Sequence, residues 1–498
     1  MSNIANRLTA LLYTLRLTLW FLPGLIAVGG VGLFALTYAL DLHLQKVSSP
    51  TELPIFFSGG ADAARSLLSA IVASLITVIA TIFSVTIVTL QLASSQYSPR
   101  LLQRFMSDRL VQIALGTYAA TFVYAVLVLR LIRSPESFSG TFNPLVSVPV
   151  ALLMALISVA LLIYFIHHIA DMSQSSSIVQ AVHDDALSAI TKLETLEEEL
   201  GTGTGEEKEH RALEKWPEDL PVPLLAQKSG YVRSVDANAI MQALDRRKGT
   251  IFVDVPLAPG TYATAGLPTA RLWLPDKEPL TSQEEHRLRQ AIILGSERIM
   301  MQDLTFSLRQ LADIALKGLS PGINDPTTTV QALNAMGSMF VALGSKRLPP
   351  NLARHEANGC RTLVRIDYPP FDKVVGIAFD QVRRAALTSG QVGVLEELLA
   401  VLERALAANR ISERQETLWE RVYLLARQTA HQIPDTYDAI SLCRKAVDVG
   451  APLLHTALRQ RVISDLEDLA SLYEEIPRGE RVREAVEAAA EDLKAEDS

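Results

Sequence analysis

Four long apolar segments constrain this chain more than any other feature. They cover residues 17–40, 67–93, 110–129 and 145–169, and none contains Asp, Glu, Lys or Arg. Each has about the 20 residues that a helix needs to cross roughly 30 Å of hydrocarbon. The first is too long for a signal-peptide core and further spans follow it, so we expect it to be retained. The sequence therefore predicts a four-span transmembrane domain within residues 1–169.

The remainder of the chain has a different composition. Helical periodicity continues over residues 170–200 and predicts a helical stalk that extends the fourth span, whereas residues 201–223 are rich in Gly, Pro and charge and predict a linker. Residues 224–276 contain β-branched and aromatic runs typical of a small β-rich module, and residues 277–498 are patterned as helices. The expected fold is an α-helical membrane protein with four transmembrane helices, a cytoplasmic β-rich module and a mainly α-helical domain.

Local signals refine this prediction. Asp236 is placed to cap a short helix within the β-rich module, and Gly249 is placed to end it. The segment RTLVRIDY at 361–368 is expected to be one strand or an extended joint. The stretches QLADIAL at 310–316 and QVRRAAL at 381–387 are similar, which indicates either duplicated helical hairpins or a chance likeness between amphipathic helices.

The orientation follows from a narrow excess of basic residues. Arg7, Arg16, Arg100, Arg104 and Arg109 lie on the side of the N-terminus, against Lys46, Arg65, Arg130 and Arg133 on the other side. We therefore expect both termini in the cytoplasm of a bacterium, with the spans in its inner membrane. The two cysteines are too few to staple a secreted domain, and a net charge of −8 argues against nucleic acid as a partner.

Polar residues follow one face of the second apolar segment. At a spacing of three or four residues the face contains Ser74, Thr77, Thr81, Ser84, Val88, Gln91 and Ser95. One interpretation is packing against other helices, since small and weakly polar residues are ordinary there. The other is a water-filled path for ions or small solutes, with Arg100 and Arg104 at its cytoplasmic mouth. Because four spans are few for one transporter, such a path would form between identical chains.

Histidines and aspartates gather near the end of the fourth span. His168 and Asp171 can share a helix face, and His183, Asp184 and Asp185 follow about four turns later. A metal or proton site is one interpretation, but a histidine at a headgroup boundary is by default an interfacial side chain. We therefore predict no metal and no cofactor.

The segment LSPGINDPTTT predicts a structural corner between two helices. We expect Gly322 to supply a positive φ, Asp325 to cap the second helix and Pro326 to fit its first turn. The lack of a GK[ST] sequence excludes a nucleotide-binding phosphate loop. The residues assigned to the corner and its support are Arg309, Asp313, Gly322, Asn324, Asp325 and Pro326.

Two stretches carry a family resemblance. ALKGLSPGINDPTTTVQALNAM at 315–336 and FSVTIVTLQLASSQYSPRLLQRFMSD at 83–108 resemble a bacterial family of predicted inner-membrane proteins catalogued as a domain of unknown function. The resemblance implies the order of spans, β-rich module and helical region, and a bacterial membrane location. It implies no activity, substrate or catalytic residue.

Function is predicted from these features together. The sequence contains no nucleophile elbow, zincin helix or dinucleotide fingerprint, so we do not expect an enzyme. We expect a homo-oligomeric channel or transport protein in the lipid bilayer, regulated by its cytoplasmic domains. The alternative is a membrane-anchored scaffold or sensor that conducts nothing.

Overall fold

The structure is a computed structural model, and its description covers most of the chain. The described residues are 20–47, 61–96, 108–132, 145–172, 174–199, 216–298, 302–344, 346, 352–357, 359–433, 435–450, 452–453 and 458–474. The chain divides into two compact units, Met1–Ser177 and Ile178–Ser498.

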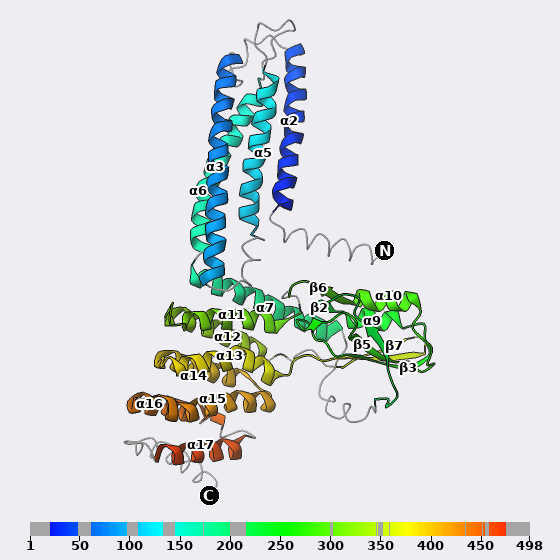
Figure 1. The fold of residues 1–498 in the computed structure, drawn as a ribbon, viewed down its shortest axis with the longest axis vertical. Coiled ribbons are helices and arrows are strands. Elements are labelled where there is room, and N and C mark those ends of the chain that lie inside the picture. Colours follow the sequence, from blue (N-terminus) through cyan, green and yellow to red (C-terminus); the bar gives the residue numbers. More distant parts are fainter. Residues whose placement is uncertain are drawn as a thin grey trace. The chain divides into compact units, whose positions relative to one another are not determined.

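The first unit is built from four long helices (Figure 1). They are α2 (Phe21–Val47), α3 (Ala61–Gln96), α5 (Arg109–Leu131) and α6 (Ser147–Met172). All four are long and apolar enough to cross a membrane, which confirms the predicted spans. The most enclosed is α5, in which 61% of the residues in the most apolar stretch are buried, against 17–22% in the other three helices. The bundle therefore packs around α5.

Small residues allow α2 and α5 to approach each other closely. A Cβ atom added to Gly30 would lie 3.0 Å from Ala120, and one added to Gly116 would lie 2.7 Å from Ile26. Because lipid supplies no hydrophobic drive between helices, such close packing is a main source of their association. Both glycines are therefore expected to be sensitive to larger side chains.

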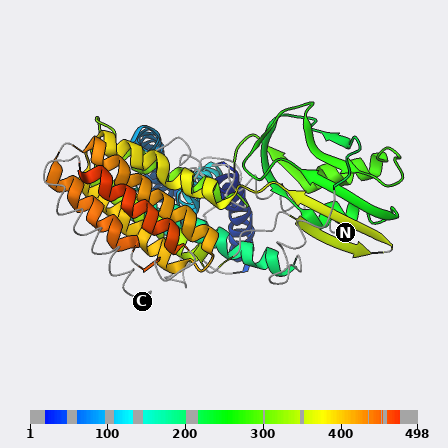
Figure 2. The ribbon, with the colours of Figure 1, turned by 90° about the horizontal axis from the view of Figure 1, so that it is seen from below.

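The second unit contains two sheets, whose strands come from distant parts of the chain (Figure 2). The five-stranded sheet has the order β1-β5-β3-β8-β7, and the three-stranded sheet has the order β4-β2-β6. Strands β3 and β8 run parallel, and every other pair is antiparallel. The strands are β1 (Val222–Leu225), β2 (Gly230–Val235), β3 (Gly249–Val255), β4 (Tyr262–Ala263), β5 (Pro268–Trp273), β6 (Ile292–Gly295), β7 (Leu352–Ala357) and β8 (Cys360–Ile366).

Of the two alternatives for residues 361–368, a strand or an extended joint, the structure shows the strand, β8. Strands β6 and β7 were not predicted, because both lie in the segment patterned as helices. A parallel pair requires a crossover connection, and between β3 and β8 this connection includes two helices of the helical region. The sheet therefore joins the β-rich module to the helical region through the chain itself.

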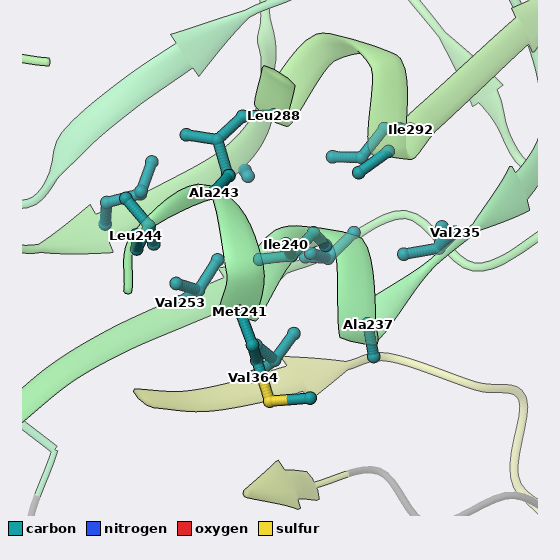
Figure 3. Packing of buried hydrophobic residues seen from close by; sticks show 14 of the residues in the cluster. Val235, Ala237, Ile240, Met241, Ala243, Leu244, Val253, Leu288, Ile292 and Val364 are labelled. Carbon is teal, nitrogen blue, oxygen red and sulfur yellow. The ribbon is translucent and has the colours of Figure 1, made fainter. Parts of the chain in front are cut away.

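The short helix α9 (Ala237–Ala243) packs into the core of the β-rich module together with α10 (Ser282–Ala291) (Figure 3). Ile240 and Met241 are buried in one cluster with Val253 of β3. Asp236 caps α9 as predicted, accepting a 2.9 Å hydrogen bond from the backbone N–H of Ala239. The prediction that Gly249 ends this helix is wrong, because α9 has already ended. Gly249 instead begins β3 with a φ of 93°.

The helical region forms layers of antiparallel hairpins (Figure 1). The hairpins are α11 (Leu304–Gly318) with α12 (Pro326–Gly344), α13 (Phe371–Thr388) with α14 (Val392–Ala408), and α15 (Ser412–Gln432) with α16 (Thr436–Gly450), followed by α17 (Arg459–Glu474). First helices pack on first helices, and second helices on second helices. The similar stretches at 310–316 and 381–387 occupy the first helices of consecutive hairpins, α11 and α13.

The prediction that the helix of the fourth span continues without a break into a stalk is wrong. Helix α6 ends at Met172, and a separate helix, α7 (Ser175–Glu199), begins three residues later. The described part of α7 has a buried apolar face, which includes Val182 and Ile190. A helix with a buried stripe packs on a protein surface rather than standing free in solvent.

Candidate functional site: the exposed polar face of α3

The polar stripe of α3 lies on the outside of the first unit. Its members with described side chains are all exposed, namely Ser74, Thr77, Thr81, Ser84, Val88 and Gln91. The side chain of Ser95, and the whole of Arg100 and Arg104, lie outside the described residues. Within one chain, the stripe is therefore not packed against the other three spans.

The opposite face of α3 makes the intramolecular contacts. Leu68, Leu75 and Ile82 are at most 5% exposed and belong to the core of the bundle. Two threonines also lie on this inner side, Thr86 and Thr89, which the sequence analysis did not single out. If the stripe serves helix packing, its partner must be supplied by another chain.

The hydroxyls of Ser74, Thr77 and Thr81 are satisfied within their own helix. Ser74 donates to the carbonyl of Ala70 at 2.9 Å, and Thr81 donates to the carbonyl of Thr77 at 2.9 Å. Hydroxyls bonded in this way tolerate either lipid or water. Gln91 differs because its amide has two N–H donors and an acceptor. It is the last residue of the candidate membrane span of α3, Asp62–Gln91. Its position suits a headgroup, water or a neighbouring chain.

Polar contacts inside the bundle come from α5. Tyr118 donates from its OH group to the carbonyl of Ser158 at 2.7 Å, and Thr121 shares a 3.2 Å hydrogen bond with the hydroxyl of Ser158. One turn further on, the OH group of Tyr124 lies 2.9 Å from Oγ1 of Thr37. The signal in the sequence was the spacing of three residues between these α5 side chains, which places them on one face.

A buried carboxylate stands at the beginning of α6. Asp41 of α2 is fully buried and accepts hydrogen bonds from the N–H groups of Val146 at 2.7 Å and Ser147 at 3.2 Å. The free N–H groups and the dipole at a helix N-terminus stabilise a negative charge. Asp41 therefore acts as a cap for α6 that is supplied by another helix.

The histidines at the far end of α6 pair differently from the prediction. His167, not His168, lies against Asp171, at 3.4 Å. His168 instead lies 3.2 Å from Asp108, the residue that caps α5. Among the described residues, no group of three His, Cys, Asp or Glu side chains could hold a metal ion. His183 belongs to the second unit, where Ser338 of α12 is its partner.

The predicted corner joins α11 to α12. Asp325 caps α12, accepting a 3.0 Å hydrogen bond from the N–H of Thr328 and a 2.5 Å hydrogen bond from its hydroxyl. These hydrogen bonds, that of the hydroxyl first, lower the pKa of Asp325. Pro326 begins α12, as expected. The positive φ, however, belongs to Asn324 at 47° and not to Gly322.

Two further contacts involve residues of α11, the helix before this corner. Arg309 donates to Oε1 of Gln381 at 3.3 Å, so it connects α11 to α13. The tight contact is at Gly318, where an added Cβ would lie 2.5 Å from Oγ1 of Thr329 and 2.7 Å from the carbonyl of Asp325. The sequence analysis missed Gly318, although a glycine at the end of a predicted helix is a signal of close approach or a cap.

The four apolar helices and the two-sheet, hairpin-stacked second unit define an integral membrane protein with a large extramembranous part. The comparisons agree: the chain belongs to the family described as "Predicted membrane protein (DUF2254)", whose match covers residues 16–404. It is similar to uncharacterised proteins of Mycobacterium tuberculosis (strain ATCC 25618 / H37Rv) and Mycobacterium bovis (strain ATCC BAA-935 / AF2122/97). Each is 31% identical over 468 residues, which is 92% of this chain and 84% of the relative. The comparison with solved structures found no match.

Proposed function

We propose that this protein is a homo-oligomeric channel or transport protein of the bacterial inner membrane, in which α3 lines the path. The observation that carries the proposal is the exposure of the polar stripe of α3, while Leu68, Leu75 and Ile82 of the same helix are buried in the bundle. A lipid-facing helix gains nothing from a row of hydroxyls and an amide, whereas a wet path or a polar contact between chains uses them.

The path would form between copies of the chain. Within one chain the four spans enclose a packed apolar core that includes Ile82 and Tyr124. A symmetric assembly that turns each α3 toward a common axis brings the polar faces together, and closed symmetry is usual in homo-oligomers. The proposal places both termini and the second unit in the cytoplasm, where the second unit would regulate opening.

Ion flux through purified protein in liposomes tests the proposal. Ser84→Leu is expected to lower flux strongly without changing insertion, because a leucine in a narrow wet path favours dewetting. Phe83→Leu is the matched control, since Phe83 is an exposed apolar residue beside the stripe and its replacement keeps that surface apolar. Equal flux in Ser84→Leu, Phe83→Leu and the unchanged protein would contradict a path along α3.

A membrane-anchored scaffold or sensor is the second candidate. The observation that favours it is the layered stack of hairpins from α11 to α17, because stacked helical hairpins present extended surfaces suited to binding other proteins. This role requires no conduction. An assembled protein that passes no ion or small solute in liposomes, yet retains partners of the second unit from a membrane extract, would support it.

A further inference from the structure

His183 connects α7 to α12 in the second unit. Its Nε2 atom lies 2.5 Å from Oγ of Ser338, and its Nδ1 atom lies 3.2 Å from Oδ1 of Asp184. The imidazole is mostly enclosed, with 15% of the side chain exposed. Gln180, one turn earlier, donates to the same oxygen of Asp184 at 2.7 Å.

The protons available to these groups depend on the charge of the imidazole. The hydroxyl of Ser338 has one proton, which it donates to the carbonyl of Ala335 at 2.9 Å when its oxygen accepts from Nε2 of a protonated His183. A neutral imidazole has one N–H, which serves either Ser338 or Asp184. Only the imidazolium donates to both, and its bonds are charge-assisted.

The ionisable side chains near His183 lie mainly on its own helix. On α7 the neighbouring carboxylates are Asp184 and Asp185, and α12 has no ionisable side chain over its whole length. On α14, which packs against α12, Arg404 is held by Glu397 at 2.8 Å and by Asn334 of α12 at 2.6 Å. The carboxylate that contacts the ring is on the same helix as the ring, and the partner across the contact is the neutral hydroxyl of Ser338, while α11, which also packs on α12, carries Arg309, Asp313 and Lys317.

The buried apolar face of α7 limits how much the loss of one hydrogen bond can change the packing of this helix. Its buried side chains are Ile178, Val179, Val182, Ala186, Ala189 and Ile190. Burial of several apolar side chains outweighs one hydrogen bond, so the loss of a proton from His183 loosens α7 without releasing it. In the chain, α7 follows α6 directly, and α7 is therefore the covalent connection from the last span to the second unit.

We propose that His183 and Ser338 form a proton-sensitive latch that holds α7 more tightly on the helical stack when His183 is protonated. The latch does not depend on conduction, so it goes beyond the function proposed above. Histidine is suited to the role because its charge ordinarily changes between about pH 5 and 8. The latch gives the second unit a response to cytoplasmic acidification.

Hydrogen exchange in the full-length protein, held in lipid nanodiscs, tests the latch. The exchange rate of α7 peptides is compared between the unchanged protein and His183→Gln, both at about pH 6 and both at about pH 8. Comparison at one pH cancels the intrinsic pH dependence of exchange. We expect α7 to exchange about fivefold more slowly in the unchanged protein at the lower pH, as a charge-assisted bond replaces a neutral one. At the higher pH the exchange rates of α7 in the two proteins should become nearly equal.

Two further variants define the outcome. Ser338→Ala removes the acceptor, and it is expected to speed exchange of α7 at the lower pH as His183→Gln does. His286→Gln changes a histidine of α10 that contacts Gln290 of its own helix, and it should leave α7 unchanged. The latch would be overturned if the ratio of α7 exchange rates between His183→Gln and the unchanged protein were the same at both pH values. An equal response to His286→Gln would also overturn it.

Discussion

The carboxylate of Asp41 accepts a 2.5 Å hydrogen bond from the hydroxyl of Ser147, 106 residues further along the chain. The pair joins the end of α2 to the first residue of α6, and both side chains are buried. An ionisable residue in a membrane bundle is costly unless its charge is compensated, and here the N-terminus of α6 provides the compensation.

Asp41→Ala should therefore destabilise the bundle by about 1–3 kcal/mol, because it leaves buried N–H groups of α6 without an acceptor. Asp41→Asn should cost less, since its amide oxygen still accepts a hydrogen bond. Unfolding of the purified protein in detergent, followed by intrinsic fluorescence, measures the difference. Equal stability of Asp41→Ala and the unchanged protein would show that the cap contributes nothing.

Cysteine accessibility distinguishes a wet stripe from a dry one. Single cysteines at Thr77, Thr81 and Ser84 should react with a small water-soluble thiol reagent in the assembled protein if α3 lines a path. Cysteines at the buried positions Leu75 and Ile82 serve as controls and should remain unreactive. Protection of the stripe positions under every condition tried would contradict a wet path along α3.

The corner between α11 and α12 allows a matched pair of glycine substitutions. Gly318→Ala should destabilise the second unit by about 1–3 kcal/mol, because its Cβ would overlap Thr329 and the backbone of Asp325. Gly322→Ala should be nearly neutral, since no atom lies within 4 Å of an added Cβ and its φ is not positive. Thermal unfolding of the two variants side by side measures this contrast, and equal melting temperatures would refute it.

Glu284 predicts a pH dependence of stability. Hydrogen bonds from Arg247, both at 2.8 Å, are the main cause that lowers the pKa of Glu284 from 4.5 to about 2. Because the pKa is lower in the folded state, this stabilisation is present above about pH 4.5 and is lost as the pH falls toward 2. The shift corresponds to about 3 kcal/mol. Glu284→Gln should flatten the slope of unfolding free energy against pH in this window, and an unchanged slope would contradict the prediction.

Topology is tested by labelling in intact cells. A cysteine placed at Ser48 should react with an impermeant thiol reagent, and one placed at Thr202 should not, because the proposal puts residues 41–66 outside and residues 170–498 in the cytoplasm. Labelling after the cells are opened shows that both cysteines are present. Reaction at Thr202 alone in intact cells would invert the orientation.

The sequence by itself determined the four spans, the cap at Asp236 and the helix start at Pro326. Each depends on residues that are close together in the chain: an apolar run long enough for a bilayer, or a side chain that reaches an N–H group three residues away. Asp325 was predicted as a cap for the same reason, since it caps α12 by accepting from the N–H of Thr328, three residues away.

Only the tertiary structure decided which faces are buried and which distant groups meet. The same polar spacing occurs on α3 and α5, yet Tyr124 lies in the core while Thr81 is exposed, because neighbouring helices cover only one of them. The contacts of Asp41 with Ser147 and of His183 with Ser338 join residues more than a hundred positions apart. Helical periodicity says which side chains share a face, but the partner of that face is chosen by packing across the whole chain.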